Sequence, residues 1–382
     1  MSRGQTSKYR IVAAPNSMKG TLDAFRFAEA VERAFQSVSE LFEIIKVPVA
    51  DGGDFTGEVL IRALLLDHQE AEVHGPLGKK VKAVYGMGHK QAVIEMADAS
   101  GMKLLSPEEL DPLKASSAGT GELILDAVRR GAGEILLGVG GSATVDGGMG
   151  LLEGLGVVFY NEKGEKLPAS GRAVGEIASW DDSALADLPE VKIQAICDVE
   201  NPLLGENGAV YVFGEQKGAA KETLPVLEQN LKHFSDLILQ KKGASLARVK
   251  GMGAAGGINL ALAGFLHAEI VSGADFVLDC VGFDQALRYT SLVITGEGQI
   301  DGQTSENKAP FAVYKRAHAK GIRVVAIGGK VTGAGAGLFD RTYSLMNAQV
   351  DQQTALSHAE ELVYERAVQA ATDFLAEREP DQ

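Results

Sequence analysis

The sequence contains few cysteines and no histidine or cysteine motif that would hold a metal. Among 382 residues there are only two cysteines, Cys197 and Cys280, and they form no CxxC pair. The seven histidines show neither metal-ligand spacing nor the pattern of a catalytic triad. We therefore expect no disulfide framework and no structural zinc, and a reducing compartment fits this cysteine usage.

Positive charge is also scarce. The formal net charge is −14, from 37 lysines and arginines against 51 aspartates and glutamates. Such an acidic chain argues against a nucleic-acid surface or an anionic membrane as partner. No apolar run reaches the roughly 18 residues that span a membrane, and the polar start, residues 1–8, lacks the apolar region of a secretory signal. We therefore expect a cytoplasmic protein.

Several nucleotide-binding and catalytic motifs are missing as well. The chain contains no G-x-x-x-x-G-K-[ST], which excludes a P-loop enzyme, and no H-R-D or D-F-G of the protein kinases. Residues 251–256 match GxGxxG formally, but the segment before them, residues 246–250, makes a poor strand. A nicotinamide-dependent oxidoreductase is therefore a minor alternative, because closely packed glycines explain the same match.

Glycine, by contrast, is abundant, and it gathers in loops after apolar segments. The central example is residues 138–150, which lie between the apolar residues 134–137 and the apolar segment 151–155. This pattern predicts a strand, a glycine-rich loop and a helix. The backbone N–H groups of such a loop can approach an anion closely. Glycines that only allow tight turns would explain the loop equally well.

The alternation of strand-like and helix-like segments predicts an α/β protein. The length favours two domains over one. Residues 71–99 contain short alternating runs that are typical of antiparallel strands, whereas βαβ units occupy both ends of the chain. We expect a parallel-sheet domain built from residues 1–70 and 285–382. A mixed-sheet α/β domain, residues 71–284, interrupts it and contains the glycine-rich loop.

Charged side chains recur in the loops that follow the predicted strands. The carboxylates are Asp51, Asp146, Asp198, Glu297 and Asp301, and the lysines are Lys19, Lys217, Lys308 and Lys330. Open α/β sheets bind ligands at the carboxyl ends of their strands. Carboxylates that hold Mg²⁺ or accept a proton, with lysines around phosphates, are what phosphoryl transfer needs. Turn-forming Asp-Gly pairs and solvated lysines would explain each residue taken alone.

Eight short stretches, none specific alone, follow one another in a recognisable order. They are A-P-N-S-M-K-G at 14–20, P-V-A-D-G-G at 48–53, G-T-G-E-L-I at 119–124, G-G-S-A-T with D-G-G at 140–148, C-D-V with N-P-L at 197–203, F-G with Q-K-G-A at 213–219, G-A-A-G-G at 253–257, and I-T-G-E-G with I-D and K-A-P at 294–310. Together they resemble the bacterial type I glycerate kinase family over nearly the whole chain.

The resemblance implies a flavodoxin-like (Rossmann-like) domain that is split by a second α/β domain, with the active site in the cleft between them. It implies ATP-dependent phosphorylation of D-glycerate, with ADP release. The product favoured is 2-phosphoglycerate, with 3-phosphoglycerate as the alternative. ATP and Mg²⁺ are the implied cofactors, and D-glycerate and ATP the implied small-molecule partners, of a monomer or homodimer.

The resemblance also implies that the motif residues line this cleft. Asp198 is the expected base or positioner for the glycerate hydroxyl, and Asp51 and Asp146 are expected to hold Mg²⁺ or substrate. Lys19 and Lys217 are expected to face the glycerate carboxylate or the phosphates. The remaining residues expected to bind substrate or phosphate are Asn16, Ser17, Gly52, Gly140, Gly141, Ser142, Thr144, Asn201, Gly296, Glu297 and Asp301.

Some positions depart from the family's pattern. Val145 stands where an asparagine is usual, Gln299 where an arginine is usual, and Asp54-Phe55-Thr56 where an acidic residue, glycine and threonine are usual. Residues 305–307 also differ from the usual Leu-Ala-Gly. These departures leave two alternatives open: a kinase of a related small hydroxy acid, and a non-catalytic nucleotide- or glycerate-binding relative.

Overall fold

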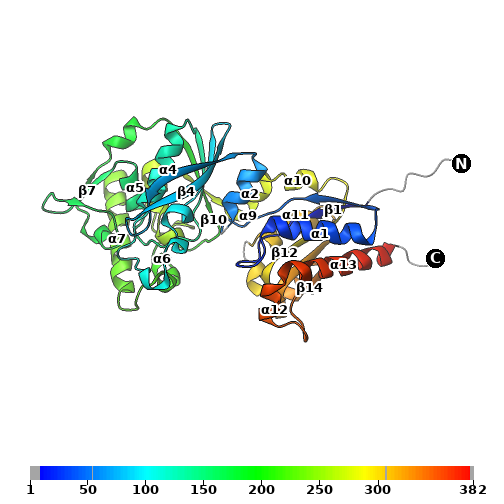
Figure 1. Ribbon diagram of the computed structural model, residues 1–382. Helices are drawn as coiled ribbons and strands as arrows, with labels where there is room; N and C mark the ends of the chain where they lie inside the picture. Colours follow the sequence, from blue (N-terminus) through cyan, green and yellow to red (C-terminus); the bar gives the residue numbers. More distant parts are fainter. Residues whose placement is uncertain (1–8, 54, 306–307, 379–382) are drawn as a thin grey trace. The chain divides into compact units, whose positions relative to one another are not determined.

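The computed structural model describes residues 9–53, 55–305 and 308–378, and the chain divides into two compact units (Figure 1). Unit 1 comprises residues 1–51 and 274–382, and unit 2 comprises residues 52–273. The sequence pattern predicts these boundaries at residues 70 and 285. In the described residues, no helix has the length and apolar character needed to cross a membrane.

Unit 1 is built on a parallel sheet of five strands in the order β14-β13-β12-β1-β2. The strands are β1 (Tyr9–Ala13), β2 (Phe42–Lys46), β12 (Thr290–Ile300), β13 (Val324–Val331) and β14 (Arg341–Ser344). Within this unit the order is 2-1-3-4-5, which is that of flavodoxin-like folds. The predicted parallel sheet from both ends of the chain is therefore confirmed.

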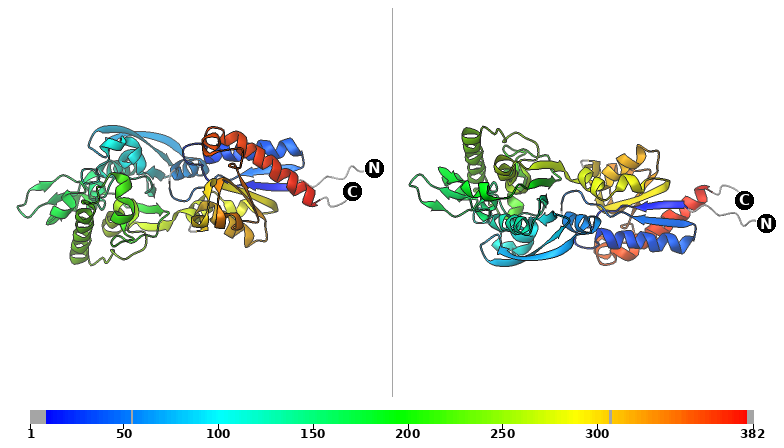
Figure 2. Two further views of the ribbon diagram at one scale, coloured as in Figure 1. Left: turned by 90° about the horizontal axis from the view of Figure 1, so that it is seen from below. Right: turned by 90° about the horizontal axis from the view of Figure 1, so that it is seen from above.

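Helices cover both faces of this sheet. They are α1 (Ala24–Val38), α9 (Gly273–Cys280), α10 (Phe283–Ala286), α11 (Ala309–His318), α12 (Gln352–Ser357) and α13 (Ala359–Arg378). Ile11 and Ala13 of β1 pack with α1 and α13, whereas Val12 between them packs with α9 to α11. This follows from the period of two along a strand. The first helix of the chain and the last lie side by side (Figure 1, Figure 2).

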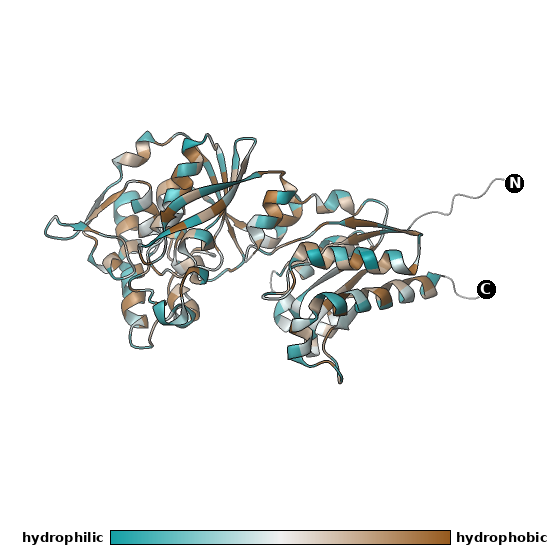
Figure 3. Ribbon diagram, in the orientation of Figure 1, coloured by the Kyte–Doolittle hydropathy of each residue, from teal (hydrophilic) through white to brown (hydrophobic). Residues whose placement is uncertain are grey.

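Helix α1 shows how the sequence specifies these elements locally. The Asp23 carboxylate accepts hydrogen bonds from the N–H groups of Phe25 and Arg26, which fixes the start of the helix. Further along, Phe27, Val31 and other apolar residues recur at helical spacing and are buried. Figure 3 shows the result, because hydrophilic and hydrophobic residues alternate along this helix.

Unit 2 contains a mixed sheet of six strands in the order β11-β10-β6-β5-β4-β3. The strands are β3 (Asp67–His74), β4 (Lys80–Gly88), β5 (Gln91–Glu95), β6 (Glu134–Gly138), β10 (Lys192–Cys197) and β11 (Glu269–Ser272). β3, β4 and β5 are antiparallel neighbours, as predicted for residues 71–99. From β5 to β11 the pairing is parallel. A small second sheet consists of β7 (Val158–Tyr160), β8 (Lys166–Leu167) and β9 (Ser179–Asp181).

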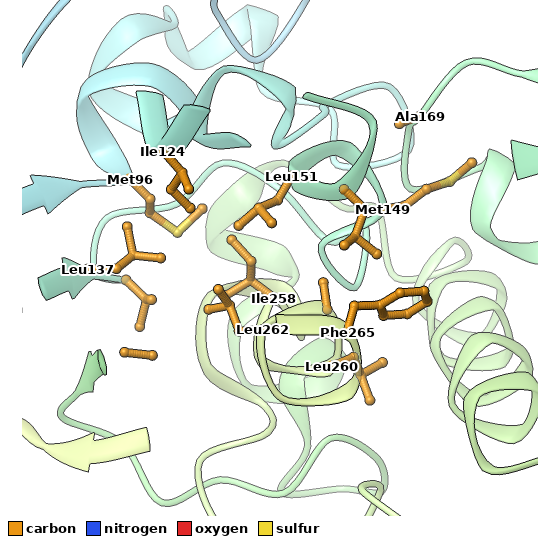
Figure 4. Close-up of a cluster of buried hydrophobic side chains, with 14 of the residues drawn as sticks. Met96, Ile124, Leu137, Met149, Leu151, Ala169, Ile258, Leu260, Leu262 and Phe265 are labelled. Atoms are coloured by element: carbon orange, nitrogen blue, oxygen red, sulfur yellow. The ribbon is translucent and has the colours of Figure 1, made fainter. Parts of the chain in front are cut away.

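A large apolar core lies between this sheet and its helices. The helices are α2 (Thr56–Ala63), α3 (Ala97–Ser100), α4 (Ala118–Arg129), α5 (Met149–Gly154), α6 (Ala209–Phe213), α7 (Leu224–Lys242) and α8 (Asn259–Leu266). Figure 4 shows Leu151 of α5 pointing toward Ile124 of α4 and Ile258 near α8. The helix that follows the glycine-rich loop is thus anchored in the core, which fixes the end of the loop.

Tyr289, just before β12, has a backbone that tyrosine rarely adopts. Its φ is 59°, and the residue is 91% exposed, so its ring gains little from packing. Left-handed backbone costs a non-glycine residue about 1–2 kcal/mol. Replacing that residue with glycine removes this strain, but it also stabilises the unfolded state by about 0.4–1 kcal/mol, because glycine has more conformational freedom there. We predict that Tyr289→Gly raises the free energy of unfolding in urea by about 0.5–1 kcal/mol. Tyr289→Val should lower it, and equal stability of the two variants would contradict the account.

Candidate active site

The glycine-rich loop runs from the end of β6 at Gly138 to the start of α5 at Met149, as the sequence predicts. Its backbone is left-handed at Gly141, Gly147 and Gly148, with φ of 70°, 60° and 79°. Residues with a side chain are strained in that conformation, so glycine is needed at these turns. The loop packs closely on its neighbours, and the following contacts fix its shape.

The carboxylate of Asp146 lies at the centre of the loop and is completely buried. Its Oδ2 accepts hydrogen bonds from the Ser117 N–H (2.8 Å), the Ser117 hydroxyl (2.7 Å) and the Gly150 N–H (3.2 Å). Its Oδ1 accepts one from the Gly148 N–H (3.1 Å). Burial raises the pKa of the Asp146 carboxyl, and these donors oppose the shift. Asp146 therefore joins the loop to the start of α4 and of α5.

This arrangement changes one part of the expected anion site. The sequence suggests that the N-terminus of the following helix faces an anion, but α5 is only six residues long. The N–H groups of Gly148 and Gly150, at its start, already donate to Asp146. Backbone groups that face a ligand must therefore lie earlier in the loop.

Lys217 holds the same loop from inside the protein. It is only 3% exposed, and its Nζ donates hydrogen bonds to the Ser142 hydroxyl (2.7 Å) and the Thr144 carbonyl (2.9 Å). Burial lowers the pKa of Lys217 to about 7, although the negative charge of Asp146 acts in the opposite direction. Near pH 7 the Lys217 amine is thus only partly protonated, and it lies against Ser142 and Thr144 of the loop.

Three successive backbone N–H groups in this first half have no acceptor among the described residues. Within the part of the chain that the structure describes, those of Gly140, Gly141 and Ser142 donate no hydrogen bond, whereas the next N–H, of Ala143, donates to Ser100. A Cβ on Gly140 would lie 3.1 Å from the Cα of Gly53, which is a tight contact, so the close approach of these two backbones favours glycine. Successive free N–H groups around a left-handed residue form a concavity that binds anions. We call these three groups the N–H cradle.

Unit 1 carries a second cluster of polar groups, where β12 continues beyond the end of β1. The Asn16 N–H donates to the Gly296 carbonyl at 2.9 Å, which places the segment after β1 beside the later part of β12. The Asn16 side chain accepts from the Ser17 N–H (2.7 Å) and donates to Asp51 Oδ2 (3.4 Å). A Cβ on Gly296 would lie 2.1 Å from the Ile327 carbonyl oxygen, so no other residue fits there.

Glu297 is one of two buried acids of this second cluster, and Asp51 is the other. Its Oε1 accepts a hydrogen bond from the Thr304 hydroxyl at 3.0 Å. Burial raises the pKa of Glu297 to about 7, with added repulsion from Asp51 and Asp301 and opposition from Thr304 and Lys308. The Lys308 Nζ lies 3.7 Å from Asp51 Oδ2. The cluster therefore combines one paired carboxylate with one that titrates near neutral pH.

The structure distributes the predicted site residues between two groups. Unit 2 contains Gly52, Gly140, Gly141, Ser142, Thr144, Asp146, Asp198, Asn201 and Lys217, and unit 1 contains Asn16, Ser17, Lys19, Asp51, Gly296, Glu297 and Asp301. Asp198 follows β10 and is half-buried, and Lys19 is exposed. The Asn201 side chain donates to the Asn207 carbonyl of its own loop.

Two contributors were not among the predicted residues. Ser117 supplies two of the bonds to Asp146, and Thr304 supplies the hydrogen bond to Glu297. Ser117 lies two residues before the G-T-G-E motif, which is the only local signal it carries. Residues 54, 306 and 307, where the sequence departs from the family pattern, lie outside the described residues.

The glycines at 251–256 do not have the setting of a dinucleotide site. Residues 246–250 are irregular rather than a strand. A Cβ on Gly256 would lie 2.0 Å from the Thr144 carbonyl oxygen, and the Gly147 N–H donates to the Gly256 carbonyl. Close packing against the glycine-rich loop therefore accounts for these glycines.

The two carboxylates expected to hold Mg²⁺ differ in their surroundings. Both oxygens of Asp146 already accept hydrogen bonds, and Asp51 faces the ammonium group of Lys308. Across the described ranges, no three His, Cys, Asp or Glu side chains are grouped as a metal site. A role for either carboxylate in binding Mg²⁺ stays a prediction.

We predict that Asp146→Asn destabilises unit 2 strongly. An asparagine keeps one acceptor oxygen, but its NH₂ group replaces the other and would face the N–H donors that now bond to that oxygen. At least one buried N–H therefore loses its acceptor. The expected loss in the free energy of unfolding is about 2–4 kcal/mol. Asp236→Asn, which breaks an exposed pair with Lys232, is the matched control and should cost less than about 0.5 kcal/mol. Equal losses in thermal or urea unfolding would contradict this reading.

Comparison with known proteins agrees with this architecture. The profile of the glycerate kinase family matches residues 11–375. Glycerate kinase of Halalkalibacterium halodurans is 39% identical over 364 residues, 94% of this chain and 96% of that protein. Glycerate 2-kinase of Escherichia coli K12 is 41% identical over 326 residues, 85% of this chain and 86% of that protein.

A crystal structure from Salmonella typhimurium LT2, assigned provisionally to a glycerate kinase 2, has a TM-score of 0.86 and 37% identity, and the match covers 98% of this chain and all of that one. The chain belongs to the glycerate kinase family.

Proposed function

We propose that this protein transfers the γ-phosphoryl group of ATP to the 2-hydroxyl of D-glycerate, giving 2-phosphoglycerate and ADP. The observation that carries the proposal is the N–H cradle of Gly140, Gly141 and Ser142, whose Ser142 hydroxyl accepts a hydrogen bond from the buried amine of Lys217. Family membership supports the reaction, and the name of the Escherichia coli relative supports the 2-position. The expected cleft between the two units stays a prediction.

The cradle suits a phosphoryl group because its donors are fixed before the ligand arrives. Asp146 and Lys217 hold the loop by six hydrogen bonds, so the three N–H groups need no rearrangement to meet an anion. Preorganised donors in a site that excludes water stabilise developing negative charge strongly. In phosphoryl transfer, positioning and charge stabilisation supply most of the catalysis.

The cluster of unit 1 suits a small hydroxy acid. Glycerate brings one carboxylate and two hydroxyls, which require cations, hydrogen-bond donors and an acceptor for the hydroxyl proton. Lys19 and Lys308 supply positive charge near the Asn16–Ser17 turn, and Asp51 and Glu297 supply acceptors. Asp198 in unit 2 stays a predicted base or positioner for the hydroxyl.

Magnesium enters this proposal as part of the substrate. Mg²⁺ commonly binds through nucleotide phosphates and several waters, with few protein ligands. This fits the surroundings of Asp51 and Asp146, which are already occupied by donors of the protein. We therefore assign the ion to MgATP and name no resident ligand for it.

The direct test measures ADP release from MgATP with D-glycerate, L-glycerate and other small hydroxy acids, with the product identified by NMR. We expect turnover with D-glycerate and phosphorus coupled to the proton on C2. Turnover only with another acid would show that this acid, and not glycerate, is the substrate. Gln299, which donates to Asp301 at 2.6 Å, would then be the residue to test for substrate choice. ATP binding without turnover of any acid would favour the non-catalytic alternative.

A second prediction concerns the buried lysine. Lys217→Met removes the positive charge and both hydrogen bonds to the loop while keeping a similar volume, so the fold should persist. We expect kcat to fall about 10²–10³-fold, as when a preorganised electrostatic group is lost. Lys221→Met, at an exposed lysine four residues later, is the control and should keep wild-type kcat. A folded Lys217→Met protein with more than a tenth of wild-type kcat would refute the role of this lysine.

A further inference from the structure

Glu297 lies at the switch point of the sheet in unit 1. β12 is the central strand, and the chain continues from β1 to β2 on one side and from β12 to β13 and β14 on the other. Ligands of open α/β sheets bind at the carboxyl ends of the strands where the order reverses in this way. Glu297 follows Gly296, whose carbonyl accepts from the Asn16 N–H at the end of β1. Its position in the fold is thus that of a residue that meets a ligand.

The surroundings of Glu297 do not satisfy its carboxyl group. It is 8% exposed, and the Thr304 hydroxyl is its one hydrogen-bond donor among the residues described. The nearby cation, Lys308, lies against Asp51 at 3.7 Å. Asp146, by comparison, is buried with four donated hydrogen bonds. A buried carboxyl with so little compensation weakens the fold, and such groups gather at functional sites.

The same surroundings set the range in which this carboxyl changes its charge. Burial raises the pKa of Glu297 to about 7. The charged groups around it are Asp51 after β2, Asp301 after β12, and Lys308 at the start of α11, and the two aspartates raise the pKa while Lys308 lowers it. A group that takes up and releases a proton near neutral pH is well matched to general-base catalysis.

We propose that Glu297 is the general base that accepts the proton of the glycerate hydroxyl during phosphoryl transfer. As the hydroxyl oxygen forms its bond to the γ-phosphorus, the bond from that phosphorus to the bridging oxygen breaks, and its electron pair leaves with ADP. The hydroxyl proton moves to the Glu297 carboxylate and then to solvent. This role rests on the proposed function, and it replaces Asp198 as the base expected from the sequence.

The first test is the pH dependence of kcat for D-glycerate phosphorylation. Because the base must be deprotonated, wild-type activity should fall as the pH drops through about 7. Glu297→Gln keeps the size of the side chain and an acceptor for Thr304 but cannot take a proton. We expect kcat to fall about 10²–10³-fold, while KM for both substrates stays within about threefold of the wild-type value. The fall in kcat at low pH, which we call the acid limb, should be absent. Glu297→Asp should recover part of kcat together with an acid limb.

Two neighbours provide a sharper test, because they should move the acid limb in opposite directions. Thr304→Val removes the hydrogen bond that favours the charged carboxylate, so the apparent pKa should rise. Asp301→Asn removes a negative charge that disfavours it, so the apparent pKa should fall. A merely structural role for Glu297 would predict no such pair of opposite shifts.

The controls separate this role from other causes. Glu153→Gln, at a carboxyl of unit 2 whose pKa is also raised by desolvation, should leave the acid limb where it is. Asp198→Asn should keep the limb, and its disappearance in that variant would overturn the proposal in favour of Asp198. A folded Glu297→Gln enzyme with more than a tenth of wild-type kcat would also overturn it. Wild-type protein without D-glycerate turnover would instead refute the proposed function, and this role with it.

Discussion

The burial of the Asp146 carboxylate is the constraint on which the glycine-rich loop depends. A charge removed from water is costly unless hydrogen bonds replace the water, and here four donors do so from three positions in the chain. Those donors come from the starts of two helices, so the loop can take only one path between them. Lys217 adds two bonds on the opposite side. In the described residues, the N–H groups of Gly140, Gly141 and Ser142 are among those of the loop that donate to no protein acceptor, and the bonds made elsewhere hold the backbone that carries them.

The two polar clusters therefore differ in physical character. In unit 2 the Asp146 carboxylate and the Lys217 amine are hydrogen-bonded within the protein. These bonds hold the loop and therefore the N–H cradle in place. In unit 1 the Glu297 carboxyl is buried with one donor, so its protonation responds to small changes around it. Phosphoryl transfer needs both properties, because negative charge must be stabilised in place and a proton must move. This difference is the reason to assign proton transfer to Glu297 rather than to Asp146.

The fold was more accessible from the sequence than the site. Apolar runs and their spacing predicted the parallel sheet and the antiparallel strands at 71–99, because these patterns are local. The local sequence does not indicate where β12 ends. This strand continues past Thr295 to Ile300 because it pairs with β13 as far as Val331. The same holds for the site residues. The sequence indicated Asp146, Lys217 and Glu297 by motif, but their burial and their partners, such as Ser117 29 residues from Asp146, follow from tertiary packing.

The departures from the family pattern now separate by what each side chain contacts. Val145 is buried in the core of unit 2, so a valine there is explained by packing against apolar neighbours. Phe55 has a left-handed φ of 73° at the start of α2, the conformation for which glycine is the natural residue. Gln299 contacts another predicted site residue, because its amide donates to Asp301 and helps to lower the pKa of that carboxyl. Asp301 in turn repels charge on Glu297. A change at 299 therefore acts on the site through electrostatics, whereas the change at 145 is absorbed by the core.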